Sequence, residues 1–225
     1  MSGALSLGAA ILLSYLAGSF PTSVVVGRLF FGKDLRAEGS GNAGGTNAFR
    51  VLGWKAGVAV VLVDVGKGLL AALVLAPIGA PSGLRPEALG LLAGAAAVAG
   101  HVWTVFAGFR GGKGIATAGG MLIGVAPIEV AVSFGVFGLV FLLTHYVSLG
   151  SLSAAVAFPV TMFFRENVFM AQVEGYGTLI FFSMGISLLI IYTHRKNITR
   201  LLRGTESRIT GLRLFKKKET ASAAG

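Results

Sequence analysis

The chain has 225 residues, of which 54% are hydrophobic and only 12% are charged, and its mean hydropathy is +0.80. Soluble globular domains carry about 25% charged residues, so this composition excludes them and predicts an integral membrane protein. The absence of cysteine excludes disulfides and thiolate metal sites, and the three histidines lack a clustered spacing, so we expect no metal site and no cofactor. The 19 basic residues against nine acidic ones fit either a nucleic-acid partner or the cytoplasmic side of a membrane, and their positions decide between the two.

Uninterrupted apolar stretches predict an all-α bundle of about seven transmembrane helices. Pro127 divides the long stretch 115–143 into a short helix, an external turn and a returning helix, although a five- or six-span arrangement stays open. No basic residue precedes the first apolar run, so we expect this run to be kept as a span rather than removed as a signal peptide. The predicted spans are 4–31, 56–78, 88–107, 115–126, 128–143, 150–164 and 176–193.

The basic residues indicate how this bundle is oriented. With the N-terminus outside, fifteen of the 19 fall in the connections 32–55, 108–114 and 144–149 and in the tail from residue 194, whereas only Arg85 and Arg165 fall in the opposite connections. Cytoplasmic loops carry such an excess, so we expect a cytoplasmic C-terminus and no nucleic-acid partner. We expect residues 208–225 to form a basic tail at the headgroups of the lipid bilayer.

The first predicted cytoplasmic connection is dense in glycines and short polar side chains. Glycines let backbone N–H groups converge on an anion, hydroxyl and amide side chains add donors, and a following helix N-terminus adds a positive dipole end. We therefore expect the connection to bind phosphate; the alternative is a flexible polar linker. The letters also match a dinucleotide fingerprint, but no strand precedes them. The candidate residues are Gly39, Ser40, Gly41, Asn42, Gly44, Thr46, Asn47 and Arg50.

The next predicted cytoplasmic connection contains Gly111-Gly112-Lys113-Gly114, which is also typical of a phosphate-binding loop. It is not a nucleotide P-loop, because Ala107 stands where the first glycine is required. Taken alone, a tight turn with a lysine on the cytoplasmic side explains it equally well. His101, at the end of the preceding span, could join the same pocket, and an imidazole titrates near the neutral pH that suits proton transfer.

Other polar residues are compatible with both functional and structural roles. Asp64 and Lys67 lie one helical turn apart within a predicted span, as either a functional pair or a buried structural ion pair. His145 is expected at the level of the lipid headgroups. The segment 194–206 leaves the last span with donors that could close a third wall around an anion.

In this order, the motifs resemble the bacterial acyl-phosphate:glycerol-3-phosphate acyltransferase family, of the PlsY type, over nearly the whole chain. Three residues depart from the usual family pattern: Gly45 stands for Ala, Thr104 for Pro and His145 for Arg. Only the last departure touches the chemistry. The motifs are Gly-Ser-Gly-Asn-x-Gly-x-Thr-Asn-x-x-Arg at 39–50, Asp-x-x-Lys-Gly at 64–68, Gly-His at 100–101, Gly-Gly-Lys-Gly-x-Ala-Thr at 111–117, the stretch 144–151, and His-Arg-x-Asn-Ile-x-Arg-Leu-Leu-x-Gly-Thr-Glu at 194–206.

The resemblance implies that residues 1–207 form an acyltransferase domain in a bacterial inner membrane, with its active site facing the cytoplasm. Such an enzyme moves a fatty acyl group from acyl phosphate to the primary hydroxyl of glycerol-3-phosphate, gives lysophosphatidic acid and phosphate, and does not require acyl-CoA. The implied site has Ser40 and His101 as catalytic residues; Gly39, Ser40, Gly41, Asn42, Gly44, Thr46 and Asn47 around acyl phosphate; Arg50, Lys113, Ser151, His194 and Asn197 around glycerol-3-phosphate; and the backbone of Gly111, Gly112 and Gly114 in the second loop.

Two questions stay open at this level. The proton of the attacking hydroxyl can go to His101 or to a phosphate oxygen of a bound substrate, and we slightly favour an orienting role for His101. The alternative function is a phosphate or organophosphate transporter, which also needs anion-binding loops. The loops fall on one side rather than at the midplane, and no internal repeat is visible, which argues against a transporter.

Overall fold

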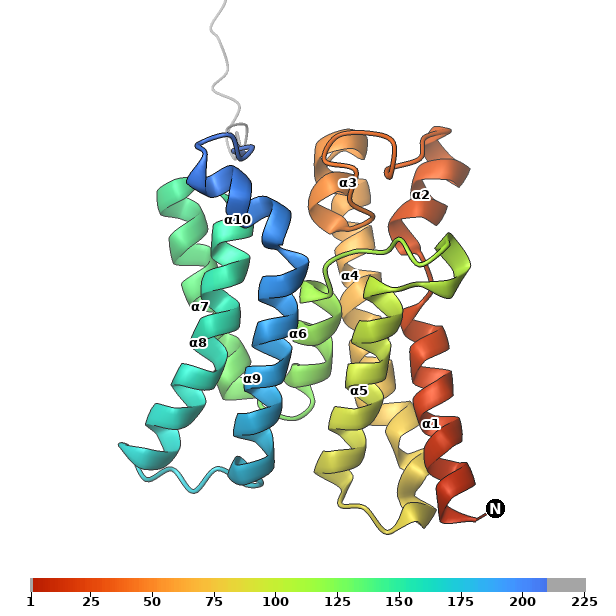
Figure 1. Ribbon diagram of the computed structural model, residues 1–225, viewed down its shortest axis with the longest axis vertical. Helices are drawn as coiled ribbons and strands as arrows, with labels where there is room; N and C mark the ends of the chain where they lie inside the picture. Colours follow the sequence, from red (N-terminus) through yellow and green to blue (C-terminus); the bar gives the residue numbers. More distant parts are fainter. Residues whose placement is uncertain (1, 210–225) are drawn as a thin grey trace, which may run out of the picture.

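The computed structural model describes residues 2–209, and all regular structure within that range is helical (Figure 1). The π-helical turn η1 (Ala71–Leu75) and the 3-10 helix η2 (Ala76–Ser82) extend α4, and the short 3-10 turn η3 (Val105–Ala107) follows α5. Apart from positions 208 and 209, the predicted basic tail lies outside the described residues. The α-helices are α1 (Gly3–Gly18), α2 (Thr22–Phe31), α3 (Gly45–Leu52), α4 (Trp54–Leu70), α5 (Pro86–Val102), α6 (Ile115–Ile123), α7 (Pro127–Thr144), α8 (Val147–Asn167), α9 (Tyr176–Thr193) and α10 (Arg195–Leu202).

Six helical segments of the described chain are long and apolar enough to cross a bilayer, which confirms the predicted all-helical membrane bundle. The seventh predicted stretch, 115–126, forms α6, whose nine residues rise only about 14 Å of a hydrocarbon core about 30 Å thick. Gly114 before it has a positive φ, and Pro127 begins the next helix. The six segments are Gly3–Phe31, Trp54–Ser82, Pro86–Ala107, Pro127–Thr144, Val147–Asn167 and Tyr176–Thr193.

The connections that were predicted to share the cytoplasmic side do lie at one end of the bundle. In Figure 1 the 32–44 connection, α3, the turn between α7 and α8, and α10 are at the upper end, with the 103–114 connection just below them. We call this end the loop end. The N-terminus and the 83–85 and 168–175 connections are at the opposite end. Which end faces the cytoplasm stays a prediction.

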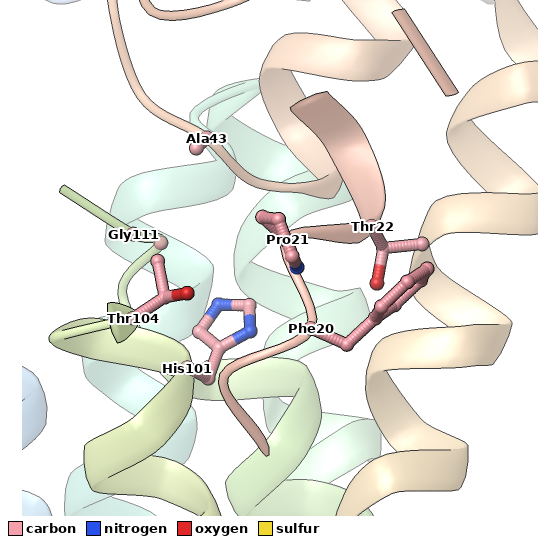
Figure 2. Close-up of a pocket in the computed structure, with 8 residues that line it drawn as sticks. Phe20, Pro21, Thr22, Ala43, His101, Thr104 and Gly111 are labelled. Carbon is pink, nitrogen blue, oxygen red and sulfur yellow. The ribbon is translucent and has the colours of Figure 1, made fainter. Parts of the chain in front are cut away.

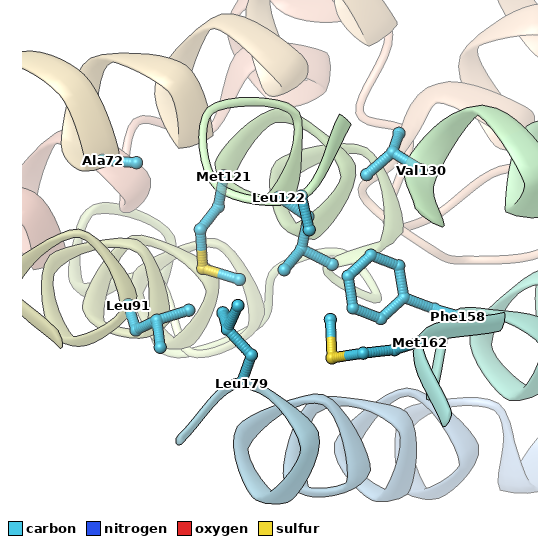
Figure 3. Close-up of a cluster of buried hydrophobic side chains, with 9 residues drawn as sticks. Ala72, Leu91, Met121, Leu122, Val130, Phe158, Met162 and Leu179 are labelled. Carbon is cyan, nitrogen blue, oxygen red and sulfur yellow. The ribbon is translucent and has the colours of Figure 1, made fainter. Parts of the chain in front are cut away.

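The short helix α6 joins two groups of helices, α1–α5 and α7–α10 (Figure 1). Met121 and Leu122 of α6 pack between Leu91 of α5 and Phe158 and Met162 of α8, in a cluster of buried apolar side chains (Figure 3). On its other face α6 crosses α4 at backbone contact. A Cβ atom at Gly68 of α4 would lie 2.0 Å from a carbonyl oxygen of α6, so the absence of a side chain at this position lets the two helices pack this closely.

A buried lysine spans the break in the first membrane segment. The helix α1 ends at Gly18 and α2 begins only after Pro21, whose ring nitrogen cannot donate a hydrogen bond. Lys67 of α4 donates from Nζ to the carbonyls of Phe20 (2.8 Å) and Gly18 (3.3 Å), and forms an ion pair with Asp64 at 2.8 Å. In apolar surroundings each of these polar groups needs a partner. The Asp64–Lys67 pair, for which the sequence allowed either a functional or a structural role, therefore holds together the break between α1 and α2.

Candidate functional site

A small cavity lies at the loop end, where the break between α1 and α2 meets the 32–44 and 103–114 connections (Figure 2). Its volume of about 10 Å³ is the space of a single water molecule. The two connections that were each predicted to bind phosphate therefore line one cavity. The cavity is lined by Phe20, Pro21, Thr22, Ala43, His101, Thr104, Gly111 and Gly112.

His101, near the end of α5, is the titratable side chain that lines this cavity, and it is buried. Its Nδ1 lies 3.4 Å from Nζ of Lys67. The same Nδ1 lies 3.7 Å from a carboxylate oxygen of Asp64. With its proton on Nε2, a neutral ring would accept at Nδ1 from the ammonium, which can only donate. Nε2 faces Gly112, where a Cβ atom would be only 2.2 Å away. His101 therefore presents its Nε2 beside the second glycine-rich connection.

Thr104, which stands where the family usually has proline, fastens the 103–114 connection to the break in the first span. Its hydroxyl donates to the carbonyl of Ser19, a contact that proline could not make. The neighbouring carbonyl of Trp103 accepts a hydrogen bond of 2.6 Å from the hydroxyl of Tyr15. These two contacts fix the start of the connection that carries Gly111 to Gly114.

Asn47 shapes the first glycine-rich connection from within. Its buried amide nitrogen donates to the carbonyls of Leu35 (2.9 Å) and Glu38 (3.0 Å), and its amide oxygen accepts from the backbone N–H of Ser40 (2.9 Å). Gly39 has φ +60°, and a Cβ atom there would lie 2.4 Å from the amide oxygen of Asn47. The side chain predicted to contact acyl phosphate thus forms hydrogen bonds inside the loop, while Ser40 is exposed.

A second polar cluster, built by Lys113, α8 and the 194–206 segment, begins one residue after Gly112. Lys113 donates from Nζ to the amide oxygen of Asn197. The amide nitrogen of Asn197, the hydroxyl of Ser148 and the guanidinium of Arg200 all donate to the carboxylate of Glu206. Burial raises the pKa of Glu206, but the hydrogen bonds from Arg200, Asn197 and Ser148 lower it overall, so Glu206 is ionised at neutral pH.

Lys113 is a partly buried cation that is poised to lose its proton. Burial lowers the pKa of its ammonium most strongly, the charge of Glu206 opposes this, and the charges of Arg200 and Arg50 lower it as well, which together bring it to about 8. The effect of Arg50 places the exposed end of α3 in the electrostatic neighbourhood of Lys113. This site therefore carries a concentration of positive charge that a phosphate group would neutralise.

His194, at the end of α9, adds an acceptor to this cluster. Its Nδ1 lies 2.8 Å from the carbonyl of Ile190, and because a carbonyl only accepts, Nδ1 carries the proton and donates. Burial, and after it the charge of Lys113, lowers the pKa of His194 to about 4, so the ring is neutral at pH 7. Nε2 of His194 is then a lone-pair nitrogen.

The structure joins the predicted site residues through one stretch of backbone, Gly111-Gly112-Lys113. Gly112 contacts the first connection, with its Cα 4.0 Å from a Cβ built at Gly44, and Lys113 contacts Asn197. Ser151 is buried on α8, one turn after Ser148. Exposed His145 follows the last residue of α7 with φ +59°, and its backbone carbonyl accepts a hydrogen bond from Ile209.

No role was predicted for Ser148, Arg200 or Glu206, although Ser148 and Arg200 both donate to Glu206 at the centre of the second cluster. The available signal was Glu206, the one acidic residue of the 194–206 segment. An acid placed among so many cations indicates charge pairing rather than lipid contact. Within residues 2–209 no three His, Cys, Asp or Glu side chains gather as a metal site would require.

Comparison with known proteins identifies relatives of this chain. A family model described as glycerol-3-phosphate acyltransferase matches residues 8–204. A glycerol-3-phosphate acyltransferase of Chlorobaculum parvum is 50% identical over 223 residues, which cover 90% of this chain and 96% of the relative. One of Chlorobium phaeobacteroides is 47% identical over 228 residues, covering 91% and 97% of the two chains.

Two solved structures share the fold. Both are crystal structures of PlsY (YgiH), an integral membrane glycerol 3-phosphate acyltransferase. The first superposes with a TM-score of 0.79 at 39% identity and covers 94% of this chain and all of that one. The second superposes with a TM-score of 0.75 at 37% identity, covering 90% and 95%. Since family model, sequence relatives and fold agree over nearly the whole length, this chain belongs to the PlsY-type family of integral membrane glycerol-3-phosphate acyltransferases.

Proposed function

We propose that this protein transfers a fatty acyl group from acyl phosphate to the primary hydroxyl of glycerol-3-phosphate, giving lysophosphatidic acid and phosphate. The observation that carries the proposal is the course of Gly111-Gly112-Lys113, which connects the first glycine-rich loop to the cationic cluster on α8 and α10. Two predicted phosphate-binding sites are therefore neighbours at one end of a membrane bundle. The related solved structures are a glycerol 3-phosphate form and a lysophosphatidic acid form, which supports this pairing of ligands.

We assign glycerol-3-phosphate to the cluster around Lys113. The ammonium of Lys113 and the guanidinium of Arg50 would neutralise its phosphate, and Asn197 and Ser151 would add hydrogen bonds. His194 would contribute in a different way. Its neutral Nε2 can accept the hydrogen bond of a substrate hydroxyl, which would turn that hydroxyl oxygen toward the acyl donor.

We assign the phosphate and carbonyl of the donor to the first glycine-rich connection. Ser40 is exposed there, and Asn42 and Thr46 are half-buried around glycines that include Gly41 at φ +70°. Donors on this loop would stabilise the negative charge that develops at the carbonyl oxygen. Acyl phosphate is already an activated mixed anhydride, so placement and charge neutralisation supply most of the acceleration and no acyl-CoA is needed.

We assign His101 an orienting role. Its Nδ1 faces the Lys67 ammonium, which leaves an N–H on Nε2 rather than a base toward the cavity. A substrate phosphate oxygen would then take the hydroxyl proton. The positive charge of the loop end further supports a location in a bacterial inner membrane with this end facing the cytoplasm, where glycerol-3-phosphate is found.

Purified protein in detergent tests the proposed reaction. With acyl phosphate and glycerol-3-phosphate present together, we expect release of phosphate and an equal amount of lysophosphatidic acid, and no product from acyl-CoA. Detergent solution has no second compartment, so a transporter would give no turnover there. Absence of phosphate release, combined with uptake of glycerol-3-phosphate by vesicles that contain the protein, would instead identify a transporter.

The variant His101→Gln separates orientation from proton transfer. The glutamine amide keeps an N–H donor but cannot act as a base, so we expect kcat to fall by less than about tenfold. Loss of an essential general base typically costs about 10²–10⁴-fold. A fall in that range, measured by phosphate release, would make His101 the base and contradict the orienting role.

The pKa of Lys113 sets a pH dependence for glycerol-3-phosphate. Below its pKa of about 8 the ammonium is charged, and it loses that charge as the pH rises above this value. We therefore expect kcat/KM for glycerol-3-phosphate to decline above about pH 8, because this ratio reports ionisations of the free enzyme. Glycerol-3-phosphate does not change its own charge in this range, because the second ionisation of a phosphate monoester lies near pH 6 and is complete at pH 8.

In the variant Lys113→Arg, the guanidinium keeps its charge through this range, so the decline should disappear even if overall activity is lower. An unchanged decline in the arginine variant would show that another group titrates.

A further inference from the structure

The two glycine-rich connections touch at two places in the described chain. At the first, the backbones of Ala43 and Gly112 are packed so closely that a Cβ atom at 112 would lie 3.0 Å from the carbonyl oxygen of Ala43. At the second, NH1 of Arg36 donates to the carbonyl of Ala107 at 3.0 Å. Among residues 2–209 this is the one side-chain hydrogen bond between the 32–44 and 103–114 connections.

Asp34 holds the guanidinium of Arg36 in place. Nε of Arg36 donates to one carboxylate oxygen of Asp34 at 3.0 Å and NH2 donates to the other at 2.7 Å. Arg28 donates to the same carboxylate from α2 at 2.8 Å. Hydrogen bonds from Arg36 hold the pKa of Asp34 well below its ordinary range, so the ion pair persists at neutral pH. A bidentate pair fixes the direction of the guanidinium, which leaves NH1 aimed at Ala107.

The backbone between these two side chains is also fixed. Leu35 is fully buried in a small apolar cluster with Ala48 of α3 and Val60 of α4. Its carbonyl accepts a hydrogen bond of 2.9 Å from Asn47, the residue that shapes the first glycine-rich loop. Arg36 is therefore attached to the first loop through Leu35 and Asn47, and to the second connection through Ala107.

We propose that Arg36 is a positioning residue, held by Asp34, that sets the separation of the two glycine-rich loops and so brings the acyl phosphate to the hydroxyl of glycerol-3-phosphate. The inference rests on the proposed function. Each loop carries its own phosphate donors without Arg36, so loss of Arg36 leaves both substrates bound. What is lost is their relative placement, and a misplacement of about 1 Å can cost about a hundredfold in rate.

The same loop offers a matched control. Lys33 forms an ion pair with Glu38 at 3.3 Å, and both side chains are more exposed than those of Arg36 and Asp34. Lys33→Met removes one positive charge from the loop, as Arg36→Met does, but leaves the contact of Arg36 with Ala107 intact. Each variant removes an ion pair of the loop, and only Arg36→Met also removes the contact with Ala107.

We expect Arg36→Met to lower kcat by about 10- to 100-fold, with the KM of each substrate within about threefold and a thermal unfolding midpoint like that of Lys33→Met. Lys33→Met should leave kcat unchanged. Asp34→Asn should lower kcat less, and the double variant should be no worse than Arg36→Met alone, because both changes remove one contact. Arg36→Lys keeps the charge but not the planar fork, so it should also lower kcat.

Three results would overturn the proposal. A kcat of Arg36→Met equal to that of Lys33→Met would remove the positioning role. A raised KM with unchanged kcat would make Arg36 a direct substrate contact. A fall in kcat that accompanies a lowered unfolding midpoint in both Arg36→Met and Arg36→Lys would make it a general stabilising residue.

A measurement independent of activity separates this inference from the proposed reaction. The chain has no cysteine, so spin labels can be placed at Ala37→Cys and Arg110→Cys alone, one exposed position on each connection and neither assigned to a substrate. We expect Arg36→Met to broaden the distribution of distances between the labels and Lys33→Met to leave it unchanged. An unchanged distribution in both would refute the positioning role even if acyl transfer is confirmed. If Arg36→Met broadens the distribution but the unsubstituted protein shows no acyl transfer, the role of Arg36 in holding the two loops is supported and the proposed reaction is refuted.

Discussion

The contact of Gly112 with His101 and Ala43 is the constraint on which the site depends. A side chain at position 112 would collide with the imidazole and with the carbonyl of Ala43, so only glycine lets the two connections meet. The same backbone, one residue later, directs Lys113 into the cluster around Asn197. Both predicted phosphate sites are therefore positioned by a single segment between α5 and α6. Helix α6 is short enough that this segment lies below the rim of the bundle (Figure 1).

The cations near the site differ in how their charge is compensated. Lys67 is paired with Asp64 and donates to two carbonyls, and Arg36 is paired with Asp34. Lys113 is different, because its contact with Asn197 is with a neutral amide. An incompletely compensated buried cation is costly, which is why its pKa falls, and an incoming phosphate would remove that cost. Binding of the proposed substrate would thus supply further counter-charge to Lys113.

The sequence predicted the helical membrane fold and the placement of both glycine-rich connections on one side of the bundle, because the lengths and order of apolar stretches can be read directly along the chain. It could not assign Asn47 to the interior of its loop, since a polar residue in a polar loop looks the same whether it faces a ligand or the backbone. Ser148 and Arg36 escaped notice because their partners, Glu206 and Ala107, are 58 and 71 positions away. Such contacts depend on how the helices pack, which the spacing of residues does not encode.

Labelling of single cysteines in sealed membrane vesicles tests the central claim most directly. Ser40→Cys and Arg110→Cys each introduce one thiol at an exposed position of a different glycine-rich connection, and Arg85→Cys places one at the opposite end. With a maleimide that cannot cross the membrane, we expect positions 40 and 110 to react from the cytoplasmic side and position 85 from the other. Reaction of positions 40 and 110 from opposite sides would contradict a shared two-phosphate site.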